Sequence, residues 1–362
     1  MQPKPLHILV SPLDWGLGHA SRCIPLIRQL LAEGHQVTLA GYGRSISMLQ
    51  QEFPALESIE LKGFSPEYPR SGRMIWQLSM LLPQFISSII SEYIALKQLI
   101  AQYRFDVIIS DNRYGLWNKK TRNILITHQV MIKVPRWLRV AEYSIYLVSR
   151  FFISRFDECW IPDYTGSPGL SGDLSHKYIL PQNAKFIGPL SRFQQTEFPA
   201  PGEKNANIAV VISGPEPQRS IFEDIVIDQL SSSNRVVTIV SGKPESNGIA
   251  VAEGNLTVIP YLSGEGLHAL ISASSLVICR SGYSSIMDLE ALGARALFVP
   301  TPGQTEQIYL AGLHQNEGTV LSKAQGDLSL ETDIPLALTY PGFRTRSPGA
   351  GLKSAIAGLG KK

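Results

Sequence analysis

The stretch LHILVSPLDWGLGHASRC (residues 6–23) decides the fold. Its apolar, β-branched start predicts a strand over 6–12, Gly16 and Gly18 predict a tight turn, and the segment after them predicts a helix that begins near Ser21. A strand that is apolar on both faces and is followed at once by a helix is typical of a parallel sheet covered by helices. The sequence therefore predicts a doubly wound α/β unit at the start of the chain.

The same alternation of short apolar runs and helical segments continues to the end of the chain. Further strands are predicted over 36–41, 57–61, 106–111, 123–128, 158–162 and 185–189, and then over 207–213, 235–242, 256–262, 276–282 and 295–300. The second group restarts the pattern, with helices predicted over about 218–231, 264–273, 284–293 and 304–314.

Two domains are expected, because 362 residues exceed what one hydrophobic core usually spans. The polar stretch 189–207 separates the two groups of strands and contains three prolines, which is typical of a linker. We predict an α/β protein in which two Rossmann-like parallel-sheet domains face an interdomain cleft. The predicted parts are an N-terminal domain (1–190), a linker (191–206), a C-terminal domain (207–345) and a tail (346–362).

Composition limits the classes of function. The chain has 33 basic and 30 acidic residues, a net charge of +3, so its overall charge does not favour nucleic acid as a partner. The three cysteines (Cys23, Cys159 and Cys279) are far apart, which argues against a disulfide framework and a zinc site. With no signal peptide recognisable at the N-terminus, we expect a cytoplasmic protein.

One segment, residues 74–101, is apolar enough to be tested for a membrane role. It carries only Glu92 and Lys97 as charges, but Pro83 and several glutamines and serines interrupt it. Two interpretations remain: a long half-buried helix that is kinked or begins at Pro83, and a helix that rests on a bilayer surface.

Polar residues collect where the predicted strands of the first domain end. In parallel sheets these carboxyl ends share one edge, where ligands bind. His19 follows the first strand and suits a general base, and Asp111 ends another strand, where it could orient that histidine. Asp14, His128 and Gln129 lie on the same rim and are predicted to face an acceptor.

The second domain has comparable loops. Ser213 and Gly214 follow its first strand, and Ser281 and Gly282 precede a helix whose N-terminus favours a phosphate. Farther along that helix lie Asp288 and Glu290, of which only one can line the site because residues two apart point to different faces.

These residues carry a resemblance to a known family. The stretch RSGYSSIMDLEALGARALFVPTPGQTEQIYLAG (280–312) resembles the donor-binding region of GT-B glycosyltransferases. It is most similar to glycosyltransferase family 28, the bacterial group that contains the N-acetylglucosaminyltransferase of peptidoglycan lipid II synthesis. GLGH with Ala20, Ser21 and Arg22 is similar to the N-terminal glycine-rich loop of that group, and THQ (127–129) resembles its His-Glu-Gln turn.

The resemblance implies a nucleotide diphosphate-sugar donor, most often UDP-linked, held by the C-terminal domain, and an acceptor on the N-terminal domain. Asp288 matches the acid that binds the ribose, which selects it over Glu290. The other residues implied at the donor are Gly16, Gly18, Ser213, Gly214, Arg219, Tyr261, Leu262, Arg280, Ser281, Gly282, Glu306 and Gln307. Among them, Arg280 or Arg219 would stabilise the leaving phosphates, Glu306 and Gln307 would read the sugar hydroxyls, and the backbone of Tyr261 and Leu262 would meet the base.

The expected reaction is an inverting transfer to a hydroxyl, with His19 as base and Asp111 as its partner. The family works without a metal, and the sequence has no Asp-x-Asp motif; we expect neither metal nor cofactor, the nucleotide-sugar being a substrate. The sequence departs from the family in its shorter GLGH loop and in SGPEPQR (213–219), where a glycine-rich turn is usual. The tail gives only a weak signal for the helix with which the family closes.

The acceptor is less defined. Residues 113–155 hold nine Lys or Arg and one acid, interleaved with aromatic residues. On a helix through 136–155, Arg136, Arg139 and Arg150 would share one face. Such a segment suits an anionic membrane surface at the inner face of the membrane and a lipid-linked or cell-envelope acceptor, or else a solvated basic face over a packed core.

Other functions remain open. GLGHASRC also resembles the loop of nucleotide-sugar hydrolases of the pseudaminic acid pathway, which share the GT-B architecture and use the histidine to activate water. Sugar 2-epimerases of related fold are a third enzyme class. A non-catalytic nucleotide-sugar or nucleic-acid binding protein is the alternative from a different class, with residues 113–155 as its basic groove.

Overall fold

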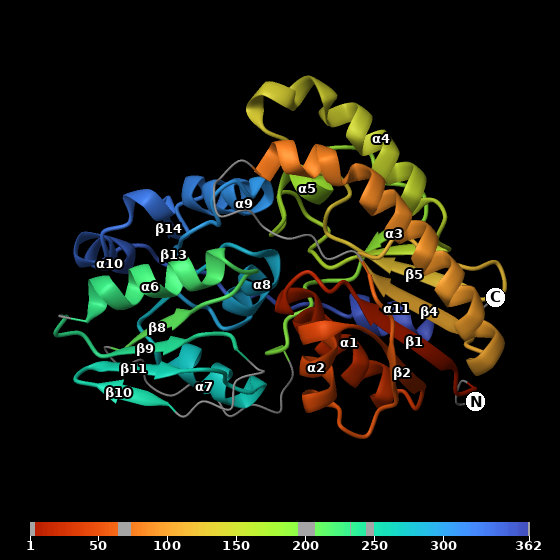
Figure 1. Cartoon of the computed structure of the whole chain (residues 1–362), viewed down its shortest axis with the longest axis horizontal. Helices are drawn as coiled ribbons and strands as arrows, with labels where there is room; N and C mark the ends of the chain where they lie inside the picture. The colour runs from red at the N-terminus through yellow and green to blue at the C-terminus, as the bar shows by residue number, and fades with distance from the viewer. Residues whose placement is uncertain (1–3, 64–73, 195–206, 232, 244–249, 361–362) are drawn as a thin grey trace. The chain divides into compact units, whose positions relative to one another are not determined.

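A computed structural model gives the fold (Figure 1), and it describes residues 4–63, 74–194, 207–231, 233–243 and 250–360, without the side chains of 74–82 and 136. The chain forms two compact units. Among the described residues, unit 1 comprises residues 4–63, 76–190 and 348–360, and unit 2 comprises residues 74–75, 191–194 and 207–347. Most of the predicted linker, residues 195–206, lies outside the described residues.

Unit 1 is built on a seven-stranded, wholly parallel sheet. Its strand order is β3-β2-β1-β4-β5-β6-β7, so the direction of winding reverses between β1 and β4. The strands are β1 (His7–Pro12), β2 (Gln36–Gly41), β3 (Ser58–Glu60), β4 (Val107–Asp111), β5 (Arg122–Ile126), β6 (Glu158–Ile161) and β7 (Ala184–Phe186). The helices are α1 (Leu17–Ala32), α2 (Gly43–Glu52), α3 (Met74–Tyr103), the 3₁₀ helix η1 (Arg136–Ala141), α4 (Glu142–Ile153), α5 (Asp173–His176) and α11 (Gly351–Ala357).

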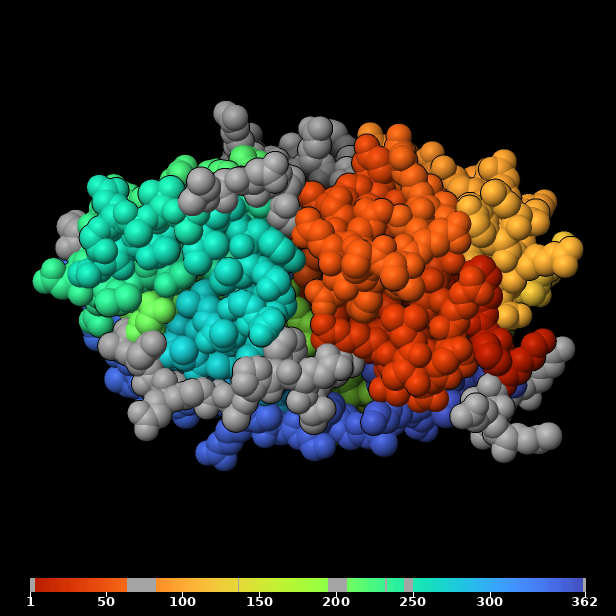
Figure 2. Space-filling model, turned by 90° about the horizontal axis from the view of Figure 1, so that it is seen from below, coloured from red at the N-terminus to blue at the C-terminus, as the bar shows by residue number. Residues whose placement is uncertain are grey.

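Helices cover both faces of this sheet, as its doubly apolar strands require. Figure 1 shows α1 and α2 on one side and α3 and α4 on the other. Leu9 of β1 and Ile108 of β4 pack with Leu96 of α3 in one fully buried cluster. In the space-filling view of Figure 2 the first half of this unit, red to amber, is one closely packed body.

The C-terminal tail returns to unit 1. Arg122 at the start of β5 donates to the carbonyl oxygens of Gly358 and Leu359, at 2.7 and 2.8 Å. A side chain at Gly351 would come within 2.6 Å of the carbonyl oxygen of Ile187, so α11 packs directly on the backbone of this unit. The weak tail signal in the sequence therefore corresponds to a real helix.

Unit 2 repeats the architecture with a second seven-stranded sheet, of order β10-β11-β9-β8-β12-β13-β14, in which only the pair β10–β11 is antiparallel. Its winding reverses between β8 and β12. The strands are β8 (Ile208–Val211), β9 (Val237–Val240), β10 (Val251–Glu253), β11 (Leu256–Ile259), β12 (Leu276–Cys279), β13 (Ala296–Phe298) and β14 (Leu321–Ser322). The helices are α6 (Gln218–Leu230), α7 (Gly264–Ala273), α8 (Tyr283–Ala291), α9 (Thr305–Asn316), the 3₁₀ helix η2 (Gln325–Asp327) and α10 (Leu330–Leu338).

The two sheets confirm the predicted fold class of two Rossmann-like α/β domains. Two local predictions were wrong. The first helix begins at Leu17 rather than near Ser21. Residues 136–155 do not form one helix but the 3₁₀ helix η1 followed by α4, so the face assigned to Arg136, Arg139 and Arg150 does not hold. The long helix expected over residues 74–101 is present as α3, which contains Pro83 rather than beginning there.

None of the helices in the described part of the chain is long and apolar enough to cross a bilayer.

Candidate active site

In unit 1, the polar residues lie at the point where the sheet reverses its winding. The crossovers on the two sides of this point diverge, which leaves room for a ligand beyond the carboxyl ends of the strands. Pro12 at the end of β1 pairs with Asp111 at the end of β4, so the side chain of Asp111 lies beside the start of α1. The fold thus brings residues 92 positions apart to one place.

Gly16 accounts for the position of His19. Its φ of 99° lies in the left-handed region that favours glycine, so the chain turns sharply and α1 begins at the next residue. Gly18 is consequently helical rather than part of the loop, and His19 lies in the first turn of α1. The side chain of His19 is 15% exposed, enough for one face of the ring to reach a ligand.

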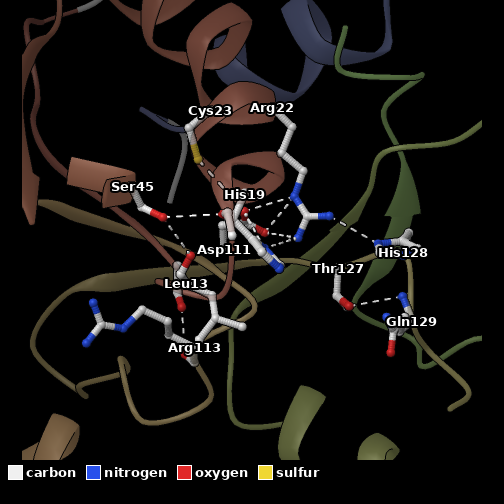
Figure 3. Close-up of polar contacts among 12 residues, drawn as sticks. Leu13, His19, Arg22, Cys23, Ser45, Asp111, Arg113, Thr127, His128 and Gln129 are labelled. Atoms are coloured by element: carbon white, nitrogen blue, oxygen red, sulfur yellow. Dashed lines mark hydrogen bonds and ion pairs between the residues drawn. The ribbon is translucent and has the colours of Figure 1, made fainter. Parts of the chain in front are cut away.

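His19 and Asp111 are in direct contact, as predicted from the sequence. Nδ1 of His19 lies 3.1 Å from Oδ2 of Asp111 (Figure 3). This arrangement leaves Nε2 as the nitrogen that can act on a substrate, provided that the proton of the neutral ring is on Nδ1.

Arg22 is the third member of this cluster, and no role was predicted for it from the sequence. Its Nε donates to both oxygens of Asp111 at 2.9 Å, and its Nη2 also donates to Oδ1. The remaining donors reach two histidines: Nη2 lies 2.9 Å from Nδ1 of His19, and Nη1 lies 3.1 Å from Nδ1 of His128. A spacing of three residues from His19 on a helix was the available signal, since such residues share a face.

The carboxylate of Asp111 stays ionised in this cluster. Burial alone would raise its pKa, but the charge of Arg22 and the contact with His19 outweigh burial and hold the pKa below its ordinary value. The thiol of Cys23, 3.9 Å from Oδ2, behaves oppositely: burial and the charge of Asp111 raise its pKa well above the ordinary value. Cys23 is therefore a neutral neighbour.

The other rim residues differ in their surroundings. His128 joins the cluster through Arg22, whereas the backbone N–H of Gln129 donates to Oγ1 of Thr127 at 3.0 Å. Asp14 accepts from the backbone N–H of Ser45 at 3.4 Å, and burial raises its pKa. This contact gives Asp14 a role in holding the start of α2.

In unit 2, the predicted donor residues likewise surround the point of reversal. Gly214, with φ of 106°, and Ser213 follow β8, while Gly282 is the N-cap of α8 beyond β12. The Ser281 hydroxyl donates to the carbonyl oxygen of Gln307 at 2.8 Å and so ties the start of α8 to α9. As the N-terminus of a helix, the first turn of α8 is suited to an anion.

The two arginines predicted at the phosphates are engaged within unit 2. Arg280 is 1% exposed and donates to the carbonyl oxygens of Val299, Pro300 and Gln218 and to the side chain of Gln325. Arg219 pairs with Glu216 and donates to the carbonyl oxygens of Ser241 and Gly242. These contacts favour structural roles over phosphate binding, because moving either guanidinium would leave buried carbonyl groups unsatisfied.

Asp288 is buried and already bonded. Its carboxylate accepts from Oγ of Ser191 at 2.8 Å and from Nε of Arg192 at 3.0 Å. Burial raises its pKa, although the charge of Arg192 opposes the rise. Glu290 points elsewhere and accepts from the backbone N–H and Nε of Arg346 at 3.0 and 3.2 Å. The two acids thus occupy different environments, as their spacing predicted.

The remaining predicted donor residues lie around the same edge. Oε1 of Gln307 accepts from the backbone N–H of Thr301 at 2.8 Å, and Glu306 is half-buried in the first turn of α9. Tyr261 and Leu262 are half-buried between β11 and α7. Across the described ranges, no group of His, Cys, Asp and Glu side chains is arranged to hold a metal ion.

The basic segment 113–155 is less uniformly exposed than its composition suggested. Arg113 is 1% exposed and pairs with Glu92 at 2.9 Å, while Arg122 pairs with Glu158 and Lys133 with Asp173. By contrast, the outer face of η1 and α4 is apolar and exposed: Trp137 is 62% exposed, Val140 94%, Tyr143 55% and Phe151 54%. Arg139 and Arg150 are exposed on the same two helices.

Two family models match the chain, one in each unit. The family 28 glycosyltransferase C-terminal domain matches residues 223–333, and a glycosyl transferase family 1 model matches residues 7–127. The first match covers α8 and α9, and the second covers both His19 and Asp111.

Relatives of similar length are glycosyltransferases. An uncharacterized glycosyltransferase of Methanosarcina mazei is 25% identical over 88% of this chain and 85% of its own length. A UDP-N-acetylglucosamine--N-acetylmuramyl-(pentapeptide) pyrophosphoryl-undecaprenol N-acetylglucosamine transferase of Rhodococcus opacus is 32% identical, over 41% of this chain and 42% of its own.

Solved structures share the whole fold. The spinosyn rhamnosyltransferase SpnG superimposes with a TM-score of 0.63 at 16% identity, covering 98% of this chain and 95% of its own. MurG of Acinetobacter baumannii gives a TM-score of 0.57 at 13% identity, covering 99% of this chain and 100% of its own. The two reversing parallel sheets, the family models and these relatives together identify the chain as a glycosyltransferase of the GT-B fold that resembles family 28.

Proposed function

We propose that this glycosyltransferase moves a sugar, with inversion and without a metal, from a nucleotide diphosphate-sugar to a hydroxyl acceptor. The contact between Nδ1 of His19 and Oδ2 of Asp111, at the reversal point of unit 1, carries the proposal. With its proton on Nδ1 and held by Asp111, His19 takes the proton of the acceptor hydroxyl on Nε2. The acceptor oxygen forms a bond to the anomeric carbon as the bond to the diphosphate breaks on the opposite side.

The donor half is assigned to unit 2. The diphosphate would lie at the first turn of α8, where backbone N–H groups and the helix dipole would stabilise the charge that develops on the leaving group. Arg280 and Arg219 would act indirectly by fixing the loops around that turn. Asp288 would receive the ribose hydroxyls. A UDP-linked donor is favoured because the Rhodococcus opacus relative is named for a UDP-sugar.

The test of the reaction is product analysis with a panel of UDP-, GDP- and dTDP-sugars. Release of nucleotide diphosphate only when a hydroxyl acceptor is present, with the opposite anomeric configuration in the product, supports the proposal. Release that is equally fast with water alone identifies a nucleotide-sugar hydrolase instead. Activity that survives exhaustive chelation distinguishes a metal-independent reaction from one that needs an added cation.

Replacing Asp288 by asparagine should abolish the stabilisation by nucleotide. At 100 times its dissociation constant, UDP adds about 2.7 kcal/mol to the stability of the wild type, which thermal unfolding resolves. The variant should lose most of this increment, because a neutral amide binds ribose hydroxyls less strongly than a carboxylate does. Asp327→Asn, exposed in η2 of the same unit, is the matched control. An unchanged shift in Asp288→Asn would place the ribose elsewhere.

We also propose that unit 1 docks on an anionic membrane surface through the outer face of η1 and α4, where it would meet a lipid-linked acceptor. Exposed Trp137 and Phe151 supply apolar anchors, and Arg139 and Arg150 supply charge attraction. Arg155 lies over the rings of Trp117 and Phe151, at 5.6 and 4.5 Å from their centres, and adds a further cation beside the anchors. This placement gives a peripheral location at the inner face of the membrane.

The double variant Arg139→Gln/Arg150→Gln should bind anionic vesicles about 30-fold more weakly, since each basic residue near such a surface contributes about 1 kcal/mol. Flotation with phosphatidylserine-containing vesicles at low salt measures the affinity. Arg235→Gln/Arg344→Gln, which removes two exposed cations of unit 2, is the control. Equal binding by both double variants, or none by the wild type, would contradict the docking proposal.

A further inference from the structure

The guanidinium of Arg22 is surrounded by groups whose proton positions it can set. It is 2% exposed and lies between the carboxylate of Asp111 and the Nδ1 atoms of His19 and His128 (Figure 3). A guanidinium carries five N–H donors, has no acceptor and stays protonated in proteins. Any atom with which it forms a hydrogen bond must therefore accept.

For His128 this condition allows only one neutral tautomer. Nη1 of Arg22 lies 3.1 Å from its Nδ1, so Nδ1 must carry a lone pair and the proton of the neutral ring must be on Nε2. His128 is thereby fixed as a neutral imidazole that donates from Nε2. A residue predicted only as part of the rim acquires a defined hydrogen-bonding character.

For His19, Asp111 and Arg22 require opposite protonation states of the same atom, Nδ1. Oδ2 of Asp111, 3.1 Å from Nδ1, can only accept and requires a proton on Nδ1. Nη2 of Arg22, 2.9 Å from the same Nδ1, can only donate and requires a lone pair there. A neutral imidazole satisfies one of these contacts at a time, and the two choices are its two tautomers.

At rest, the hydrogen bonds favour the tautomer of His19 whose Nδ1 accepts from Arg22. Asp111 keeps three hydrogen bonds from Arg22 whichever tautomer His19 adopts, because both Nε contacts and the contact from Nη2 to Oδ1 are independent of the ring. Nη2 has a second hydrogen, which it donates to Nδ1 of His19. The distance from Nη2 to Nδ1 is 2.9 Å, shorter than the 3.1 Å between Nδ1 and Oδ2 of Asp111.

We propose that Arg22 is a positioning residue that sets the tautomers of both histidines. It fixes His128 as an Nε2–H donor, and at rest it holds His19 with its proton on Nε2. In that state Nε2 of His19 can donate to an acceptor hydroxyl but cannot take its proton. The base tautomer forms when the ring releases its Nε2 proton to water and takes up a proton from water on Nδ1. Nδ1–H then donates to Oδ2 of Asp111, the second hydrogen of Nη2 no longer bonds to Nδ1, and the Arg22–Asp111 pair is kept.

The consequence for catalysis rests on the function proposed above, but the assignment of tautomers does not. Nitrogen NMR of the full chain labelled with ¹⁵N-histidine reads the tautomers directly, at a pH about two units above the ordinary histidine pKa of ~6.5. His19→Gln and His128→Gln assign the two signals. The expected wild-type spectrum shows both rings protonated on Nε2 and unprotonated on Nδ1.

The variant Arg22→Met removes the guanidinium donors from the cluster, and the signal of His19 should change to a ring protonated mainly on Nδ1. Arg28→Met, on the same helix and paired with Glu52 rather than with the cluster, should leave both tautomers unchanged. A wild-type spectrum with Nδ1–H on either histidine would overturn the proposal, even if Arg22→Met fails to fold. Tautomers as expected in a protein that neither binds nor turns over any nucleotide-sugar would leave this inference standing and remove the proposed function.

Discussion

Replacing His19 by glutamine should lower kcat for sugar transfer about 10²- to 10⁴-fold, the range that a positioned general base contributes. Glutamine keeps a polar group of similar length but cannot take a proton near neutral pH. The affinity for UDP should stay unchanged, because the nucleotide is assigned to unit 2 and His19 lies in unit 1. The expected signature is thus a loss in kcat with nucleotide binding preserved.

Steady-state release of nucleotide diphosphate measures kcat, and calorimetry with UDP measures the affinity. His7→Gln is the control: His7 begins β1 at the opposite edge of the same sheet, where its Nε2 contacts Oγ1 of Thr38 at 2.9 Å, and this variant should retain wild-type kcat. If His19→Gln keeps more than about a tenth of the wild-type kcat, another group serves as the base, and His128 becomes the first candidate.

The pattern of apolar runs was sufficient to predict the two sheets, because buried parallel strands need residues that are apolar on both faces. The shortest strands escaped prediction: β14 has two residues, and β10 is an exposed three-residue edge strand, so neither carries a periodic signal. The start of α1 was misplaced for a different reason. The turn at Gly16 needs only one residue with positive φ, and sequence alone does not say which of two nearby glycines provides it.

The contact between His19 and Asp111 could be anticipated because both follow strands whose carboxyl ends meet at one edge. The role of Arg22 could not, since a basic residue in an amphipathic helix is far more often solvated than buried. For Arg280, the contacts of the side chain could not be predicted from the sequence. Its motif predicted a phosphate contact, but four acceptors from three separate segments surround its guanidinium, and such convergence is visible only in three dimensions.

Replacing Asp111 by asparagine should destabilise unit 1 by about 3–5 kcal/mol at neutral pH, the cost of removing one partner from a buried ion pair. The loss is large because Arg22 stays buried and charged, and an amide offers its guanidinium one acceptor oxygen in place of two.

The pKa of Asp111 determines how this difference in stability changes with pH. The pKa of Asp111 is lowered in the folded state, because Arg22 and His19 outweigh burial. Its charge therefore stabilises the fold at pH values above its unfolded pKa of about 3.9, and this stabilisation is lost as the pH falls through the lower, folded pKa. The difference between wild type and Asp111→Asn should be full at pH 7 and should shrink below about pH 4.

Hydrogen–deuterium exchange of peptides from β1 and β4 measures the opening free energy of unit 1 separately from unit 2, which a single unfolding curve of a two-unit chain would not do. Asp106→Asn is the matched control, because Asp106 is exposed just before the same strand and its carboxylate accepts from the backbone N–H of His7, at 2.9 Å. It should change the opening free energy by less than about 1 kcal/mol. A similarly small change in Asp111→Asn would mean that Arg22 finds another counter-charge in the folded state, and the cluster would then be dispensable for stability whatever it does in catalysis.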